Sequence, residues 1–406
     1  MGLVAGLGRL TDGEEHYLVI TDPRAPDWLD SFMGPNTRPL IAGSQSPARS
    51  AAKKLLSPAL PALRSARALA LRAAPWKAIR SRAVAAHNPI VERANPDVVH
   101  FPYQWMHRTT APSLFNPWDL QHLHFPEFFD RRALADRKAM YRVWCSQCTR
   151  IEVASKAVKR DLIEQMQVPA EKIIVIPRGA PSALFTAPTP EIVDQVRLKY
   201  HLPQDFAYYP AHTWPHKNHL RLFRALVSLR DHYGLTMNLI CSGALTDFWP
   251  VLQSSIEDLN LRDQVRFLGF VPSGDVRCLY RAADFTILPT LFEGAGLPLV
   301  EAMSEGSPLL CSSLTVLHEQ AGPAALYFDP LSPDDIARRM RELWGNESLK
   351  NQLRRSGYDH SRVYSWHRTA LICRAAYRKL AGRPLTVVDQ ALLEAATNIK
   401  VDVATH

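Results

Sequence analysis

The stretch that decides the fold is FEGAGLPLVE, residues 292–301. The apolar run before it, residues 283–289, predicts a buried parallel strand. After it, residues 302–305 continue a short helix, which Gly306 and Pro308 end. A strand, a glycine loop and a helix in this order predict a βα turn of an open α/β sheet. Ligands bind at such turns, beyond the carboxyl ends of the strands.

Two carboxylates, Glu293 and Glu301, stand at the ends of this turn with seven residues between them. Gly294 and Gly296 let the backbone approach a ligand and leave N–H groups free, and the helix start adds a partial positive charge that suits a phosphate. Glu301, in the first helical turn, can accept two hydrogen bonds from a vicinal diol such as a ribose. Glu293 lies in the loop, where it can meet a sugar hydroxyl. The other interpretation is an ordinary βα turn with two solvated glutamates.

The same stretch resembles the E-x7-E signature of the retaining, nucleotide-sugar-dependent glycosyltransferases of family 4. These enzymes have the GT-B fold, so the resemblance implies an α/β protein of two doubly wound, Rossmann-like domains with a cleft between them. Flanking segments agree in type and order from about residue 95 to residue 380. In the family this turn holds the donor, with Glu301 on the ribose and Glu293 on the transferred sugar. The resemblance also implies donor contacts from the loop backbone, at Gly294, Ala295, Gly296 and Leu297.

A chain of 406 residues is long enough for two domains, each with a full core. We expect an N-terminal, acceptor-side domain over residues 1–180 and a C-terminal, nucleotide-sugar-binding domain over residues 191–363. Between them, residues 181–190 contain three prolines and few apolar residues, which predicts a hinge linker. Residues 364–406 follow as a tail, in which a helix beginning at residues 364–366 crosses back to the first domain in GT-B proteins.

The beginning of the chain departs from the family pattern. Residues 2–10 are typical of the end of a helix, and residues 16–21 predict a strand. A first domain of this family starts with one more strand and a glycine-rich loop ahead of that helix. Gly6 and Gly8 do not supply the loop, because no strand precedes them. We therefore expect the domain to lack its first strand and loop, which in the family face the donor diphosphate and the acceptor.

An aromatic-rich loop over residues 116–129 follows the strand predicted at residues 96–101. In the family a His-Asp dipeptide lies here, and its histidine faces the transferred sugar. Trp118 stands in the place of that histidine, while Asp119 is kept. Trp118 can stack on a sugar face or fill the pocket, but it cannot carry a proton. His122 or His124 could take over the polar contact.

The donor diphosphate has a second predicted contact in the sequence PHKNH, residues 215–219. This run resembles the family's strand-to-helix loop, whose lysine neutralises the pyrophosphate, and Lys217 at a helix start suits that role. The family often adds an arginine a few residues earlier, where this chain has His212. For the nucleotide, the resemblance implies contacts near Val271 and at Ser242, at the ends of two further strands.

Two other groups of residues have spacings that metal sites use. Cys145 and Cys148 form a lone C-x-x-C, which we interpret as two packed thiols because no second pair exists. His122, His124 and Glu127 are loosely spaced as ligands, yet the composition around them favours an aromatic loop on the acceptor side. We see no Asp-x-Asp motif of the kind that holds Mg²⁺ on a nucleotide sugar. We expect no metal and no cofactor besides the nucleotide sugar as co-substrate.

The net charge of +9 is concentrated between residues 48 and 93, where ten basic residues face one acidic residue. A basic amphipathic helix on an anionic membrane surface is one interpretation. A footprint for nucleic acid is another, and solvated helices with basic outer faces are the third. We expect no nucleic-acid partner. No signal peptide and no apolar run of 18 residues are visible, which predicts a cytoplasmic protein, either free or peripheral to the membrane.

Three hypotheses follow. The first is a retaining, metal-independent glycosyltransferase, with Glu293, Asp119 and Lys217 as its catalytic residues. It transfers a hexosyl group, mannosyl as the first choice, from a nucleotide-diphosphate sugar to a saccharide or a lipid-linked saccharide. The second is a catalytically impaired, nucleotide-binding GT-B protein that lacks the N-terminal loop. The third is a membrane or nucleic-acid binder that acts through residues 48–93, with binding that falls steeply as salt rises.

Overall fold

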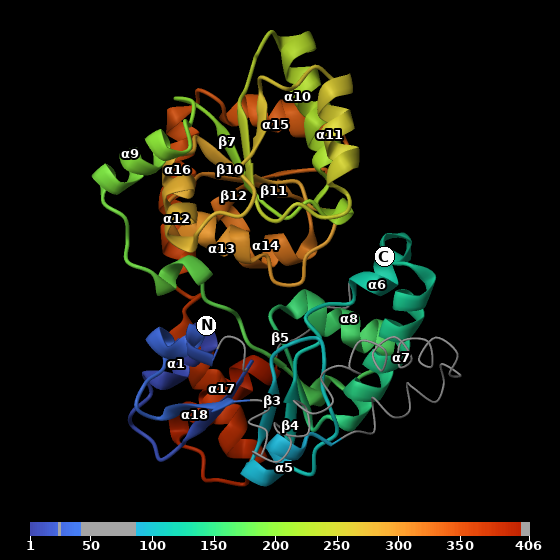
Figure 1. The fold of residues 1–406 in the computed structure, drawn as a ribbon, viewed down its shortest axis with the longest axis vertical. Helices are drawn as coiled ribbons and strands as arrows, with labels where there is room; N and C mark the ends of the chain where they lie inside the picture. Colours follow the sequence, from blue (N-terminus) through green and yellow to red (C-terminus); the bar gives the residue numbers. More distant parts are fainter. Residues whose placement is uncertain (23–25, 42–86, 399–406) are drawn as a thin grey trace, which may run out of the picture.

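The computed structural model describes residues 1–22, 26–41 and 87–398, which form two α/β domains, one above the other in Figure 1. The C-terminal domain contains one six-stranded sheet, in which every pairing is parallel. The order across the sheet is β9-β8-β7-β10-β11-β12, so the domain's first strand, β7, lies at the centre. The strands are β7 (Ala207–Pro210), β8 (Leu239–Ser242), β9 (Val265–Phe267), β10 (Phe285–Leu288), β11 (Leu309–Ser312) and β12 (Ala325–Phe328).

Helices cover this sheet on both faces, as the burial of its strands shows. Every residue of β8, β10 and β11 is buried, which is the pattern of parallel strands packed on two sides. The covering segments include four helices from the first half of the domain and four from the second. They are α9 (Pro190–Lys199), α10 (His219–Tyr233), α11 (Trp249–Asp258), α12 (Ser273–Ala282), α13 (Leu297–Ser304), α14 (Thr315–Ala321), α15 (Pro333–Leu343) and α16 (Glu347–Ser361).

The N-terminal domain divides its described strands between two sheets. Four strands form a parallel sheet in the order β3-β4-β5-β6, and β1 pairs in parallel with β2 alone. Within the described ranges, no strand pairs with β3 on the side away from β4, or with β1 on the side away from β2. The strands are β1 (Tyr17–Thr21), β2 (Thr37–Ile41), β3 (Val99–Phe101), β4 (Ser113–Phe115), β5 (Arg150–Val153) and β6 (Ile173–Val175).

Several helices accompany these strands, and 3-10 turns at η1 (Pro26–Phe32), η3 (Pro126–Phe128) and η4 (Ala170–Lys172) join them. Two helices begin with strong caps, since Asp130 accepts hydrogen bonds at the start of α7 and Ser155 does so at the start of α8. The helices are α1 (Gly2–Gly8), α5 (Pro89–Ala94), α6 (Gln121–His124), α7 (Arg131–Gln147) and α8 (Lys156–Met166).

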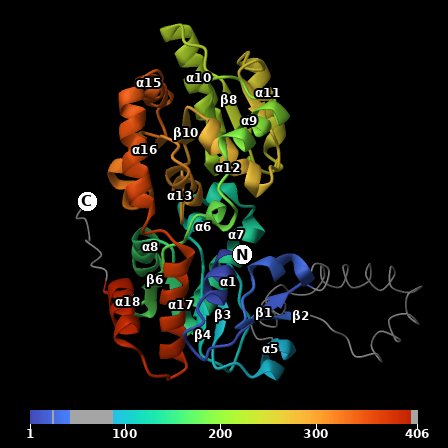
Figure 2. The same ribbon diagram turned by 90° about the vertical axis from the view of Figure 1, so that its left-hand side faces the viewer.

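The C-terminal end of the chain returns to the N-terminal domain. Helices α17 (Trp366–Leu380) and α18 (Val387–Thr397) lie beside α1 and β6 in Figures 1 and 2. The helix predicted from residue 364–366 onward is therefore present, and it packs on α1. The Trp366 indole N–H donates to the carbonyl of Ala180, over 3.0 Å, beside the linker turn η5 (Pro181–Leu184). Hydrophobic residues of α17 and α18 form a common core with Ile174 and Ile176.

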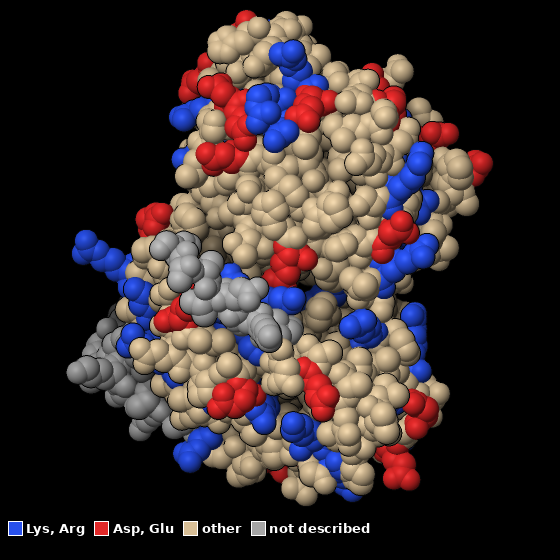
Figure 3. Space-filling view, turned by 180° about the vertical axis from the view of Figure 1, so that it is seen from behind, with Lys and Arg blue, Asp and Glu red and all other residues tan. Residues whose placement is uncertain are grey.

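Most of the basic segment predicted between residues 48 and 93 lies outside the described residues, which resume at residue 87. On the face seen in Figure 3, Lys and Arg side chains are interspersed with Asp and Glu. Among the helices that the structure describes, none is long and apolar enough to span a bilayer. The interpretations of the basic segment therefore stay predictions.

Candidate functional site

Two loops meet at the centre of the C-terminal sheet, one after β7 and one after β10. These strands are neighbours, and the chain leaves them in opposite directions across the sheet, so a crevice opens beyond their carboxyl ends. The loops are tied together by the Leu291 N–H, which donates to the carbonyl of His216 over 2.8 Å. From them come Lys217 and Glu293, whose Nζ and Oε1 atoms lie 2.5 Å apart. The structure thus brings together the two predicted site residues that are 76 positions apart in the chain.

Lys217 is held by the backbone around it. It ends the 3-10 turn η6 (Pro215–Lys217), and Asn218 follows in the left-handed conformation with φ at 62°. The Asn218 side-chain amide donates to the carbonyls of Pro289 and Pro330, over 2.8 Å each. Tyr209 donates its hydroxyl to the carbonyl of Lys217 over 2.5 Å. These contacts fix where the ammonium group can reach, which is the requirement for a preorganised anion site.

At two positions of the turn, neighbouring atoms lie so close to the backbone that only glycine fits. Gly296 has φ at 47°, and a Cβ there would stand 2.4 Å from the Gln320 side-chain oxygen. Gly294 faces the other domain, where a Cβ would meet the Asp119 side chain and the Trp118 carbonyl at 3.0 Å each. The turn therefore needs glycine both for its own conformation and for the contact across the cleft.

The N-terminal domain forms the opposite wall with Trp118 and Asp119. The Asp119 carboxylate accepts a hydrogen bond from the Gln121 N–H, over 3.0 Å. Burial raises the pKa of Asp119 above its usual value, and this effect exceeds the opposing ones from that hydrogen bond and from the charge of Arg137. Trp118 has φ at 63°, which is rare for a bulky residue and marks a position that the surroundings enforce.

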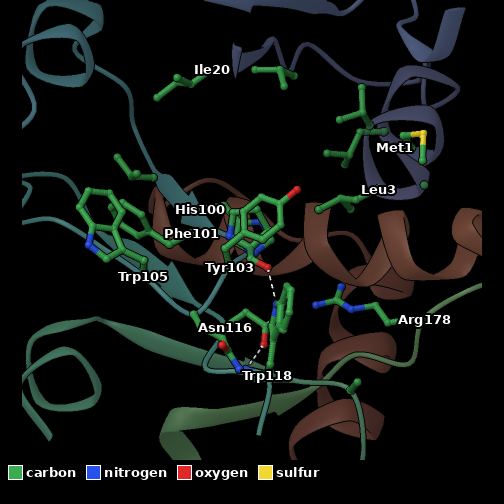
Figure 4. A pocket seen from close by; sticks show the side chains of 18 of the residues that line it. Met1, Leu3, Ile20, His100, Phe101, Tyr103, Trp105, Asn116, Trp118 and Arg178 are labelled. Atoms are coloured by element: carbon green, nitrogen blue, oxygen red, sulfur yellow. Dashed lines mark hydrogen bonds between the residues drawn. The ribbon is translucent and has the colours of Figure 1, made fainter. Parts of the chain in front are cut away.

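A cavity of about 1970 Å³ runs from this cleft into the N-terminal domain, and Figure 4 shows part of its lining. Its volume exceeds that of an ordinary small-molecule site, which is roughly 300–1,000 Å³. Eight of the predicted site residues line it. They are Asp119, His212, Lys217, Glu293, Gly294, Ala295, Gly296 and Leu297.

Five exposed aromatic side chains also line this cavity. Between 45% and 59% of their surface is exposed, and they are Trp28, Tyr103, Trp105, Trp118 and Trp214. The Trp118 indole N–H donates to the carbonyl of Pro102 over 2.9 Å, and its ring lies 5.8 Å from that of Tyr103. Figure 4 shows Tyr103 and Trp118 next to each other. Such amphipathic rings suit ligands that present both apolar faces and hydroxyl groups.

Glu301 has a different environment from the one that its predicted role suggests. It is absent from the residues that line the cavity. One carboxylate oxygen accepts a hydrogen bond from the Ser182 N–H in the linker, over 3.0 Å, and the other accepts one from the Tyr280 hydroxyl, over 3.1 Å. Burial raises the pKa of Glu301 to about 7. In this arrangement the residue fastens the linker to α13, and its contact with a ribose stays a prediction.

Of the remaining predicted donor contacts, Ser242 and Val271 do not line the cavity. Ser242 is buried, with its hydroxyl 2.6 Å from that of Tyr208. Val271 is buried beside Phe270, whose side chain is 81% exposed. His212 does line the cavity, and its Nδ1 accepts a hydrogen bond from the Ala244 N–H over 2.7 Å. Burial, and then the charge of Lys217, lower the pKa of His212, which favours the neutral ring.

The N-terminal domain contains a buried ionic network that the sequence did not predict. Glu152 is fully buried and lies 2.5 Å from the Arg178 guanidinium and 2.9 Å from Nε2 of His100. Burial alone would raise the pKa of Glu152, but the charges of Arg178 and His100 outweigh it and hold that pKa below its usual value. Nδ1 of His100 lies 2.7 Å from the hydroxyl of Tyr377, in α17. Both His100 and Arg178 reach the cavity wall in Figure 4.

The residues with metal-like spacing do not converge in the structure. His122 is buried with its ring 4.8 Å from that of Tyr141, and burial lowers its pKa to about 4. His124 bonds to Asp161 instead, over 2.7 Å. Cys145 and Cys148 are buried free thiols, as predicted. Across the described part of the chain, no three His, Cys, Asp or Glu side chains lie close enough to hold a metal ion.

The two domains touch directly across the cleft. The Ser155 hydroxyl donates to the carbonyl of Gly294 over 2.9 Å. At the start of α8, the N–H groups of Lys156 and Ala157 donate to the Glu319 carboxylate, over 2.7 and 3.0 Å. A carboxylate at a helix N-terminus is favourable, so these contacts hold the two domains in the relative position that the structure shows.

Comparisons with known proteins agree with this architecture. The model of the family "Glycosyl transferases group 1" matches residues 198–360, and that of "Glycosyltransferase Family 4" matches residues 42–184. Together the two matches cover most of the chain. The chain belongs to the group 1, family 4-like glycosyltransferases.

Curated relatives in this family include two bacterial enzymes. O-antigen chain mannosyltransferase B of Escherichia coli is 30% identical over 223 residues, which are 55% of this chain and 58% of the relative. O-antigen chain mannosyltransferase RfbU of Salmonella typhimurium is 27% identical over 212 residues, or 52% and 55% of the two chains. The chain thus matches little more than half the length of these relatives.

Solved structures establish the GT-B fold. HepE from Anabaena, determined with UDP and glucose, superposes with a TM-score of 0.66 at 16% identity, over 93% of this chain and 95% of its own. Sucrose-phosphate synthase from Thermosynechococcus elongatus gives 0.65 at 18% identity, over 94% and 92%. These likenesses show the fold, and the predicted fold class is confirmed.

Proposed function

We propose that this glycosyltransferase moves a hexosyl group, with mannosyl as the first choice, from a nucleotide-diphosphate sugar to a saccharide or a lipid-linked saccharide. The observation that carries the proposal is the pair formed by Lys217 and Glu293 at the crevice of the C-terminal sheet. The mannosyl choice is supported by the names of the two curated relatives. The nucleotide-sugar donor is supported by the structures of HepE with UDP and with UDP-glucose.

The donor diphosphate would lie between Lys217 and the start of α13. An ammonium group has three donors, so Lys217 can keep its bond to Glu293 and still bind a phosphate oxygen. At the start of α13, Pro298 has no N–H and the Leu299 N–H donates to the carbonyl of Gly296, so the N–H groups of Gly296 and Leu297 are the ones that can meet a phosphate at the positive dipole end. Together these groups favour the negative charge that develops on the leaving diphosphate. Because Lys217 supplies positive charge at that point, we expect transfer to proceed without a metal.

Glu293 and Asp119 would orient the sugar between the two walls of the cleft. In the transfer, the bond from the anomeric carbon to the diphosphate breaks and a bond to the acceptor oxygen forms. The products are the glycosylated acceptor, the nucleoside diphosphate and one proton. Glu293 and Asp119 accept hydrogen bonds from sugar hydroxyls, and burial raises the pKa of the Asp119 carboxyl above its usual value. We infer retention at the anomeric carbon from the family resemblance.

The acceptor would approach over the aromatic side chains of the cavity. Trp118 and Tyr103 present exposed ring faces beside Asp119, a combination that fits a sugar ring. This arrangement supports a saccharide end as the acceptor, whether it is free or carried on a lipid.

The test is a transfer assay. Purified protein is incubated with GDP-mannose, UDP-glucose and dTDP-rhamnose in turn, with and without saccharide acceptors, and release of the nucleoside diphosphate is measured. We expect release from one donor that depends on the acceptor, is unchanged by EDTA, and is lost in Lys217→Ala. The surface variant Lys199→Ala, whose lysine pairs with Asp275, should retain it. No release from any donor, with nucleotide binding intact, would replace this proposal with the second one.

The second candidate is a nucleotide-binding protein of the same fold with impaired turnover. Two observations favour it, namely the split sheet of the N-terminal domain and Trp118 at the position where the family has a histidine. It predicts that nucleotides bind through Lys217 while no sugar is transferred.

A further inference from the structure

Helix α14 contacts both domains through two adjacent side chains. Gln320 reaches into its own domain, where its Nε2 donates to the carbonyl of Ala295, in the glycine loop of the site, over 2.6 Å. Glu319 reaches the other domain, where its carboxylate accepts from the N–H groups of Lys156 and Ala157 at the start of α8. Neighbouring residues of a helix point about 100° apart, so one helix can make both contacts. The glycine loop and α8 are therefore held by the same helix.

The position of Gln320 is enforced by its surroundings. Gln320 is 4% exposed, and the neighbouring Leu317 and Ala321 are fully buried. The Tyr364 hydroxyl donates to the backbone carbonyl of Gln320 over 3.1 Å. No described residue donates a hydrogen bond to the side-chain oxygen of Gln320, and an oxygen that is buried without a partner lowers stability. An apolar side chain of similar size would avoid that cost, so the amide serves its bond to Ala295 rather than the stability of the core.

A second carbonyl of the same loop is held from the N-terminal domain. Ser155 is fully buried, and its hydroxyl donates to the carbonyl of Gly294 over 2.9 Å. Ser155 is also the N-cap of α8, whose first N–H groups bond to Glu319. Two consecutive carbonyls of the loop, those of Gly294 and Ala295, are thus bound by residues of different domains.

These two bonds fix the direction of the N–H groups that follow the carbonyls. The peptide bonds are planar and trans, so each N–H points opposite to the carbonyl of its own peptide unit. Ser155 thereby turns the Ala295 N–H away from itself, and Gln320 does the same to the Gly296 N–H. Neither N–H donates to a partner among the described residues, and both Ala295 and Gly296 line the cavity. Two unpaired N–H groups with an enforced direction are what an anion site requires.

We propose that Gln320 and Ser155 are positioning residues for the sugar-bearing phosphate of the donor, because they orient the Gly296 and Ala295 N–H groups that bind it. The inference rests on the proposed function, since it takes the donor diphosphate to lie beside this loop. Both side chains act through the backbone of the loop. Ser155 belongs to the acceptor-side domain, so the donor site is complete only when the two domains are in contact.

The experiment compares the affinity for a nucleoside diphosphate with that for its monophosphate, by calorimetric titration of the full chain. UDP, GDP, ADP and dTDP each differ from the matching monophosphate by the phosphate that the loop would bind. Gln320→Met removes the amide donor and nearly keeps the size of the side chain. We expect it to weaken binding of the diphosphate at least about fivefold and to leave the monophosphate unchanged, because a hydrogen bond to a charged group is misdirected. A merely structural role would lower both affinities together.

Two matched variants serve as controls. Gln264→Met makes the same substitution at another buried glutamine, just before β9 and so at the opposite end of the sheet, and should keep the wild-type ratio of the two affinities. Ser155→Ala should lower that ratio as Gln320→Met does. Ser332→Ala, which removes the N-cap of α15, should not.

The outcomes separate this inference from the proposed function. If the wild type binds a diphosphate and Gln320→Met or Ser155→Ala keeps the wild-type ratio, the role assigned to that residue is wrong and the donor site stands. If Gln320→Met weakens both nucleotides equally, the residue is structural and the inference is wrong. If the wild type binds no diphosphate, the proposed function and this inference fail together.

Discussion

The two domains repeat one α/β plan, yet they differ at its centre. The C-terminal sheet has β7 at its middle, and its loops after β7 and β10 bring Lys217 and Glu293 within 2.5 Å. The N-terminal sheet is divided at the corresponding place, and a cavity of about 1970 Å³ reaches into the division. The comparison shows that the predicted donor-binding residues, Lys217 and Glu293, lie at the six-stranded sheet of the C-terminal domain. Trp118 and Asp119 lie in the loop that follows β4, at the four-stranded part of the divided sheet.

The two halves also differ in what stabilises them. The C-terminal core is one continuous cluster of buried apolar side chains. The N-terminal domain depends more on contacts between segments that are far apart in the sequence, because α17 and α18 from the far end of the chain pack against α1 and β6. A buried ion pair between Glu152 and Arg178 adds to this, close to the open side of β3. Changes in the two domains should therefore have different consequences.

The largest expected effect on stability concerns that ion pair. Arg178→Met removes the guanidinium and leaves the carboxylate of Glu152 buried, which should cost about 3–5 kcal/mol of unfolding free energy. The pKa of Glu152 is lowered in the folded state, so its contribution is present above about pH 4.5, the usual value, and is lost as the pH falls through the lowered one. The acid dependence of stability should flatten in the variant, as urea unfolding between pH 3 and 7 would show.

The double variant Arg178→Met, Glu152→Gln serves as the control for this prediction. It removes both charges, so it should recover much of the stability that the single variant loses. A single variant as stable as the wild type would mean that the N-terminal domain does not depend on the pair.

A pair of leucine truncations compares the two sheets directly. Leu310→Ala in β11 empties a fully buried position and should cost about 2–5 kcal/mol. Leu18→Ala in β1 changes a side chain that is 49% exposed, so its cost should stay below about 0.5 kcal/mol. Urea unfolding of both variants measures the difference. A large loss of stability in Leu18→Ala would show that this side chain is covered in solution.

Substitutions at the C-terminal sheet should lower the activity most. Lys217→Ala removes the cation that faces the leaving diphosphate, and the expected fall in kcat is about 10²–10³-fold. The melting temperature should change little, because within the described residues the ammonium group of this lysine pairs with Glu293 alone, at the cavity wall. Steady-state rates with the active donor would measure the effect. A rate within twofold of the wild type would contradict the assigned role.

A further predicted effect concerns the hinge. The pKa of Glu301 is raised to about 7 in the folded protein, so its ionisation lowers stability as the pH rises from about 4.5 toward 7. Glu301→Gln removes this dependence and can still accept from Ser182 and bond to Tyr280. The variant should therefore be more stable than the wild type by about 3 kcal/mol at pH 8 and no more stable at pH 4. Melting temperatures across this pH range test the sign, and a variant less stable than the wild type at pH 8 would contradict it.

Local patterns were sufficient to predict part of this structure. The turn over residues 292–301, the lysine loop and the two-domain α/β fold are visible in the sequence, because glycines, prolines and apolar runs mark them within a few positions. Strand β4 is only three residues long, and α18 depends on packing against β6, so neither has a clear local pattern.

Some residues of the site could likewise be predicted from local motifs, and others could not. Lys217 and Glu293 were predicted because each lies in its own short motif. The ion pair of Glu152 with Arg178 joins residues from different elements of the chain, and so does the hydrogen bond of Glu301 with Ser182. Only the fold brings these residues together. One signal was present, since Glu152 stands between the apolar residues Ile151 and Val153 of β5, and a charge in such a strand indicates a buried partner.

The central claim is that the C-terminal domain holds a formed site for a nucleotide-diphosphate donor. The most direct test is calorimetric titration of the wild type and of Lys217→Ala with UDP, GDP, ADP and dTDP. We predict that one nucleotide binds the wild type at a single site and that Lys217→Ala binds it at least about tenfold more weakly, a loss of 1.4 kcal/mol or more. If none of the four nucleotides binds the wild type, or if Lys217→Ala binds as tightly, the assignment of this crevice as the donor site is wrong.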